Sequence, residues 1–158
     1  MPAFMSSRIA LDFVYASGDA DHTEFYEGNA SDFSTMFVPV TPSPAGMIFT
    51  AQQSNIFHVT GSFSLKPFVS SNIAALENTL ILLKPIAFFR STTGPISTAN
   101  TQADSTDLYL GTEIDLVIMA RILSDLGLSI GSGVLIPSAA ITDSSPLIKG
   151  SVALSLSM

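Results

Sequence analysis

Polar and apolar residues alternate with a period of two along much of the chain. In the segment 147–158, small or polar residues stand between the apolar side chains of Ile148, Val152, Leu154 and Leu156. The same alternation marks five further segments, at 8–15, 55–66, 76–90, 108–122 and 126–136. A period of two is typical of β-strands with one apolar face, because successive side chains point to opposite faces of a sheet. The sequence therefore predicts an all-β protein of about six antiparallel strands.

The connections between these segments alternate in length. Two short connections, at 67–75 and 123–125, separate longer ones at 16–54, 91–107 and 137–147. Outer-membrane barrels alternate short periplasmic turns with longer extracellular loops in this way. We therefore expect residues 1–158 to form a single segment of an antiparallel transmembrane β-barrel, with the three longer connections as external loops.

The composition agrees with a surface that faces lipid. Hydrophobic residues make up 47% of the chain and charged residues only 12%, whereas ordinary soluble domains carry about 25% charged residues. No stretch reaches the roughly 18 uninterrupted apolar residues that a membrane helix needs, since Lys84 and Pro85 interrupt the most apolar run. We expect a protein of the bacterial outer membrane, with the lipid bilayer and the outer-membrane assembly machinery as partners.

Other classes of protein fit the sequence less well. The net charge of −7 argues against nucleic acid as a partner. The chain has no cysteine, and it lacks the usual nucleophile, phosphate-loop and zinc-protease motifs, so we do not expect an enzyme. A soluble β-sandwich or small β-barrel that acts as a binding module remains the alternative. The long predicted strands argue against a sandwich, which prefers strands of about 5–6 residues.

The charged residues are the candidates for lining a pore. All basic residues fall on the polar side of a predicted strand or at a strand end, as expected if they avoid lipid. Together with one histidine and three acids, the candidates are Arg8, Asp12, His58, Lys66, Lys84, Arg90, Glu113, Asp115, Arg121 and Lys149. Rings of such side chains tune selectivity in channels. The alternative is a salt-bridge network that only braces the interior.

The densest acidic cluster lies in the first predicted loop. Asp19, Asp21, Glu24 and Glu27 offer carboxylate oxygens that could bind Ca²⁺ weakly. Their spacing differs from that of an EF-hand, and a solvated loop is the ordinary outcome for such a charge run. We expect no other cofactor, because the two histidines are isolated from further metal ligands.

Two adjacent hairpin segments resemble a known family. The strand 109–116 (YLGTEIDL), the turn 124–125 and the glycine-rich strand 126–134 (LGLSIGSGV) resemble the C-terminal hairpins of alginate-export-type outer-membrane barrels. A proline-containing loop follows in that family, and Ile136-Pro137 stands at the matching place. The stretch 11–19 also resembles a strand-to-loop junction of such proteins. The resemblance implies a monomeric barrel of more strands, which passes small or polymeric solutes through its lumen.

Two features depart from that family. The chain ends in Met158 rather than an aromatic residue, and acids dilute the basic residues of the predicted lumen, so the resemblance does not fix the solute. Single-chain membrane barrels start at about eight strands, and open sheet edges are excluded from hydrocarbon. We therefore expect the chain to be the C-terminal part of a longer barrel, with closure by several copies as the alternative.

Overall fold

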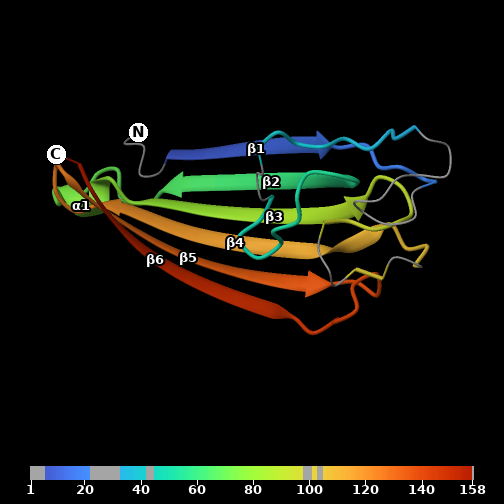
Figure 1. Ribbon diagram of the computed structural model, residues 1–158. Coiled ribbons are helices and arrows are strands. Elements are labelled where there is room, and N and C mark those ends of the chain that lie inside the picture. The colour runs from blue at the N-terminus through green and yellow to red at the C-terminus, as the bar shows by residue number, and fades with distance from the viewer. Residues whose placement is uncertain (1–5, 22–32, 42–44, 98–100, 103–104, 158) are drawn as a thin grey trace.

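The computed structural model describes residues 6–21, 33–41, 45–97, 101–102 and 105–157. Its main feature is one antiparallel sheet in which the six strands are neighbours in chain order (Figure 1). The strands are β1 Ser6–Tyr15, β2 Ile56–Lys66, β3 Leu80–Arg90, β4 Tyr109–Arg121, β5 Leu126–Pro137 and β6 Leu147–Leu156. Within the described residues, β1 and β6 pair on one side only, so the sheet is open. This confirms the predicted all-β fold of an incomplete barrel, and the described strands form one sheet rather than the two sheets of a sandwich.

The short connections gather at one end of the sheet. One of them contains the only described helix, α1 (Ala74–Glu77), and the other joins β4 to β5 (Figure 1). The strand that we predicted from residue 76 begins instead at Leu80, because backbone N–H groups of Glu77 and Asn78 donate to the carbonyls of Ile73 and Ala74. Among the described residues, no helix is long and apolar enough to cross a bilayer.

The register places residues of similar polarity on the same face of the sheet. Directly paired residues share a face, and Asp12 pairs with Thr60, Thr60 with Ile86, and Ile86 with Glu113. We call this the inner face and the opposite one the outer face. The pairing places all six basic residues on the inner face. The outer face carries exposed apolar side chains, among them Ile9, Leu11, Phe13, Phe63, Leu83, Leu116, Ile118, Ile130, Val134, Val152 and Leu154.

A proline interrupts the pairing of two central strands. Pro85 lacks a backbone N–H group, and a central strand ordinarily excludes proline for that reason. The ladder between β2 and β3 is continuous from Ile56 to Thr60 and resumes at Phe63, so the interruption lies opposite Pro85. Gly61 stands at this place, and a Cβ atom there would lie 3.4 Å from the Pro85 ring. Gly61 therefore lies beside the proline ring, at a distance where a Cβ would make only an ordinary contact.

A bulge shifts the register near the long-loop end of β3 and β4. The pairing slips between Phe88 and Phe89, so that Phe89 pairs with Tyr109 and Phe88 with Gly111. Gly111 has a φ of 150°, in a region that side chains with a Cβ avoid. The extra residue at the bulge, Leu110, is fully buried, although the alternation predicted over 108–122 places it on the same side as Ile114 and Leu116. A bulge re-aims one side chain in this way because it breaks the strict alternation.

We predict that Gly111→Ala destabilises the protein far more than Gly61→Ala. A Cβ at position 111 would lie 2.6 Å from the carbonyl oxygen of Ile136 and would require a strained φ, which costs about 1–3 kcal/mol. A Cβ at position 61 makes only an ordinary contact, so its effect should stay within about 0.5 kcal/mol. Urea unfolding in lipid vesicles measures both. Equal midpoints for the two variants would contradict a constrained bulge.

Candidate functional site

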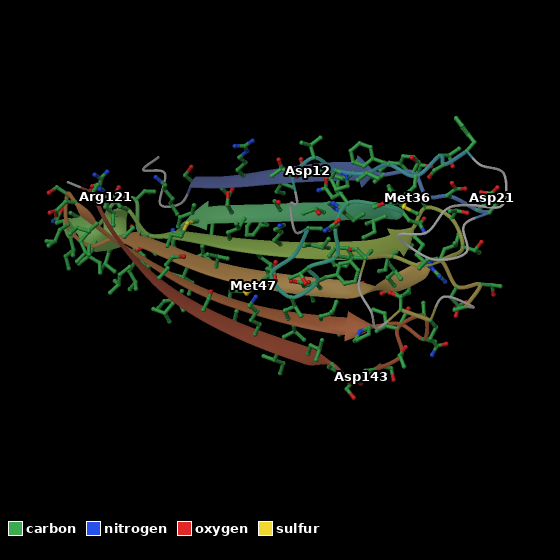
Figure 2. All side chains as sticks on the ribbon, viewed as in Figure 1. Asp12, Asp21, Met36, Met47, Arg121 and Asp143 are labelled. Carbon is green, nitrogen blue, oxygen red and sulfur yellow. The ribbon has the colours of Figure 1, made fainter. Side chains whose placement is uncertain are left out.

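A segment of the first long connection folds back over the inner face. Residues 45–54, which we call the inner segment, cross in front of the central strands (Figure 1), and Met47 lies over the middle of the sheet (Figure 2). We expected the whole of 16–54 to be an external loop. The inner segment departs from this expectation because its apolar residues pack on the sheet: the aromatic rings of Phe49 and Phe88 stack with centroids 4.2 Å apart.

The Glu113 carboxylate on β4 binds the backbone of the inner segment. The N–H groups of Ile48 and Phe49 donate to its two oxygens, at 2.7 Å and 2.8 Å. Glu113 is completely buried, and a buried charge is costly without hydrogen-bond partners. A Cβ at Gly46 would meet a Glu113 oxygen, so glycine lets the segment pass close to the carboxylate.

Two lysines from other strands bind carbonyls of the same segment. The ammonium group of Lys84 on β3 donates to the carbonyl of Ala45 at 3.2 Å. The ammonium group of Lys149 on β6 donates to the carbonyl of Met47 at 2.8 Å. Three of the predicted pore-lining residues therefore converge on one short segment, from three different strands.

Two further candidates lie beneath or beside the inner segment. Asp115 pairs with Lys84 in the register and is buried, and its Oδ1 atom has no hydrogen-bond partner among the described residues. His58 is also buried, with its Nδ1 atom 3.3 Å from the hydroxyl of Thr60. The structure thus covers both side chains, and whether they line a conduit stays a prediction.

Arg90, the next candidate, organises the connection 91–108 at the long-loop end. Its guanidinium group is buried and donates to the carbonyls of Gly94 at 2.8 Å, Ser105 at 2.6 Å and Asp107 at 3.1 Å. A planar guanidinium has five N–H donors and suits such multiple contacts. The side chain that we predicted on a pore wall is therefore engaged with the protein's own backbone.

The remaining candidates lie away from the inner segment. Arg8 and Asp12 are exposed on β1. Arg121 lies at the short-connection end of the sheet (Figure 2), where its guanidinium group donates to the Ser124 carbonyl. Lys66 and Arg121 line a hollow at that end, together with small residues of β5 and β6. The structure therefore separates these four residues from the cluster around Glu113.

Only half of the proposed Ca²⁺ ligands are in the described residues. Glu24 and Glu27 lie outside them. Asp19 accepts a hydrogen bond from the N–H group of Thr35 at 3.0 Å. A hydrogen bond with the Asp21 side chain, with support from Thr35, lowers the pKa of Asp19 to about 2. In the described part of the chain, no three metal-ligating side chains converge, and Ca²⁺ binding stays a prediction.

Sequence reasoning missed Asn55, which joins the long connections to one another. Its φ of 54° lies in the left-handed region, which asparagine tolerates better than most residues. Its side-chain amide donates to the Pro95 carbonyl at 3.1 Å and accepts from the Thr92 N–H group at 2.9 Å. Its backbone N–H donates to the Ser17 carbonyl. The period-two pattern gives no signal for such a residue, because it lies just before a strand.

A row of aromatic side chains crosses the outer face near the long-loop end. Tyr15 pairs with Phe57, Phe57 with Phe89, and Phe89 with Tyr109. The ring centroids of Phe57 and Phe89 are 5.7 Å apart, and those of Phe89 and Tyr109 are 5.4 Å apart. Aromatic girdles of this kind mark the membrane interfaces of outer-membrane barrels.

The comparison with protein families agrees with a sheet that has one charged face and one apolar face. The chain matches the alginate export family over residues 3–151, which include five strands and the first half of β6. The match reaches well beyond the hairpins on which the sequence resemblance rested. No curated protein and no solved structure matches the chain. The family is one of outer-membrane exporters with a β-rich fold, rather than a family of enzymes. The chain belongs to the alginate export family.

Proposed function

We propose that the chain forms part of an outer-membrane conduit through which small or polymeric solutes pass passively along the inner face. The observation that carries this proposal is the separation of charge between the two faces of the same strands. Every basic side chain lies on the inner face, while apolar side chains stay exposed on the outer face. A lipid-embedded barrel needs this arrangement, because charges on the lipid face are destabilising.

The height of the apolar outer band supports the same proposal. On β2, outer-face residues run from Phe57 in the aromatic row to Leu65, next to the strand end at Lys66. At about 3.3 Å per residue and a tilt of about 40°, this stretch spans roughly 20 Å along the membrane normal. The apolar band of known barrels is about 25 Å tall. On β2 the apolar outer stretch therefore covers most of the height of such a band.

The inner face does not by itself specify the solute. Beside the basic residues it carries Asp12, Glu113 and Asp115, and the structure engages several of these charges with the protein's own backbone. A strongly basic surface would favour an anionic polymer, whereas this surface is mixed. We also propose that the outer-membrane assembly machinery inserts the chain. The edges of β1 and β6, which stay unpaired in the described residues, agree with this proposal.

Osmotic swelling of lipid vesicles tests the conduit. We predict that vesicles containing the folded full-length protein swell in an isotonic solution of a small neutral sugar, because the conduit admits the sugar. Vesicles that contain heat-denatured protein serve as the control and should stay osmotically sealed. Sealed vesicles with fully folded protein would contradict the proposal. A protein that is monodisperse in buffer without detergent would contradict the membrane location itself.

A further inference from the structure

The inner segment is held by two different kinds of contact. Phe49 and Ala51 belong to a buried apolar cluster with Ile86, Phe88 and Leu110, so the second half of the segment is fixed by packing. The first half, residues 45–48, which we call the tip, adds Ala45 and Ile48 to the same apolar packing. It also carries most of the polar contacts, with the Glu113 carboxylate and with the ammonium groups of two lysines.

The inner face of β5 leaves space for this tip. On β5 the inner face carries glycines at positions 131 and 133. A Cβ at Gly131 would lie 2.5 Å from the Met47 methyl group, whereas one at Gly133 would lie 2.6 Å from Oδ1 of Asp115 and at an ordinary contact distance of 3.4 Å from the Met47 sulfur. With Gly46 against Glu113, glycines on both partners allow the close approach. The tip therefore packs closely on the inner face of β5, in a position that we call its seat.

The closed position also has a cost. Glu113 and Asp115 are two acids on the same face of β4, both buried where the inner segment covers the sheet. Glu113 accepts hydrogen bonds from two N–H groups. The Asp115 carboxylate is hydrogen-bonded to the Met47 backbone and the Glu113 side chain, but its Oδ1 atom has no hydrogen-bond partner in the described structure. A buried oxygen without a partner is unfavourable, because it has lost its bond to water. When the tip leaves its seat, water can bind Oδ1 and can also replace the Met47 backbone contact of Asp115.

We propose that the inner segment is the constriction of the conduit, and that Glu113 is the positioning residue that latches its tip. Lys84 and Lys149 secure the tip on either side of Glu113. Release of the tip widens the space over β5 and β6, where Gly131, Gly133 and Ser151 of the inner face are small. This inference rests on the proposed conduit function, since a constriction matters only where solutes pass.

Two readouts on the Glu113→Gln variant test the latch and the constriction separately. The amide retains one accepting oxygen but loses the charge and the second acceptor, so the tip should leave its seat more often. Because the chain has no cysteine, Met47→Cys supplies a single reporter thiol. We expect a membrane-impermeant maleimide to modify this thiol at least about two-fold faster in the Glu113→Gln background. We also expect the single-channel conductance of the full-length protein, with Met47 intact, to rise at least about two-fold.

The matched controls use the same chemistry elsewhere. Glu77→Gln changes an exposed acid on α1 and should alter neither readout. A Met47→Cys, Ser151→Cys pair joined by a short thiol cross-linker should return the conductance of Glu113→Gln to the wild-type value. Ser151 pairs with Gly131, against which Met47 packs, so the link ties the tip to its seat.

Each outcome decides one part of the proposal. An unchanged modification rate in a folded Glu113→Gln variant would overturn the latch. A faster rate with unchanged conductance, in a wild-type protein that does conduct, would overturn the constriction while leaving the conduit intact. If neither protein conducts, the proposed conduit fails and the constriction with it, whereas the modification rate still decides whether Glu113 holds the tip.

Discussion

Arg90→Ala should lower the free energy of unfolding by about 3–5 kcal/mol. The buried guanidinium donates to carbonyls of Gly94, Ser105 and Asp107, and each hydrogen bond to a charged group contributes about 1.5–3 kcal/mol, without strict additivity. Alanine removes these bonds together and leaves the carbonyls without a donor. Urea unfolding of the protein in lipid vesicles measures the change through its midpoint and slope.

The loss should also be visible locally, in the connection that Arg90 organises. We expect a protease added to the folded variant to cleave between residues 91 and 108 faster than in the wild type, because the carbonyls that Arg90 binds lie along this stretch. Arg90→Lys keeps the charge but not the planar set of five donors, so it should recover only part of the stability.

Arg8→Ala is the matched control for the charge itself. Arg8 lies on the inner face of β1 and is exposed, so its removal should change the free energy of unfolding by less than about 0.5 kcal/mol. If Arg8→Ala and Arg90→Ala were equally destabilising, the effect would come from net charge. In that case the hydrogen bonds of Arg90 would not be what holds the connection.

The faces of the strands could be predicted from the sequence because their cause is local. Successive side chains alternate across a sheet, so the parity of Lys84 and Arg90 in β3 fixes their face once one side is apolar. The prediction failed at Leu110, where a bulge breaks the parity. It also failed at residues 76–79, where one helical turn precedes β3. Both exceptions depend on the backbone of neighbouring elements, which a pattern along one segment does not contain.

The partners of the charged residues could not be predicted, because those contacts join distant parts of the chain. Glu113 binds the backbone of Ile48 and Phe49, and backbone N–H groups carry no signature in the sequence. One signal was present: residues 45–51 contain Met47, Ile48 and Phe49, a set too apolar for a solvated loop. The inner face was therefore predictable as a surface, but what covers it was not.

The assignment of the two faces leads to a second prediction with a large effect, which concerns two neighbouring residues of β5. Ile130 is exposed on the outer face near the middle of the strand, whereas Ser129 lies on the inner face and lines the hollow beside Lys66 and Arg121. A lysine on the lipid face near the bilayer midplane costs about 2–4 kcal/mol, because its charge is withdrawn from water. We expect Ile130→Lys to lose this amount, and Ser129→Lys to lose less than about 1 kcal/mol.

The comparison is informative because the two substitutions add the same charge one residue apart. A general effect of lysine on folding or on assembly would appear in both variants, whereas contact with lipid affects only position 130. Urea midpoints in vesicles, together with the fraction of each variant that inserts into the bilayer, separate these cases. If Ser129→Lys were the more damaging change, the inner and outer faces would have to be exchanged. The basic residues would then face lipid, and neither the conduit nor its constriction could lie on the side to which we assign them.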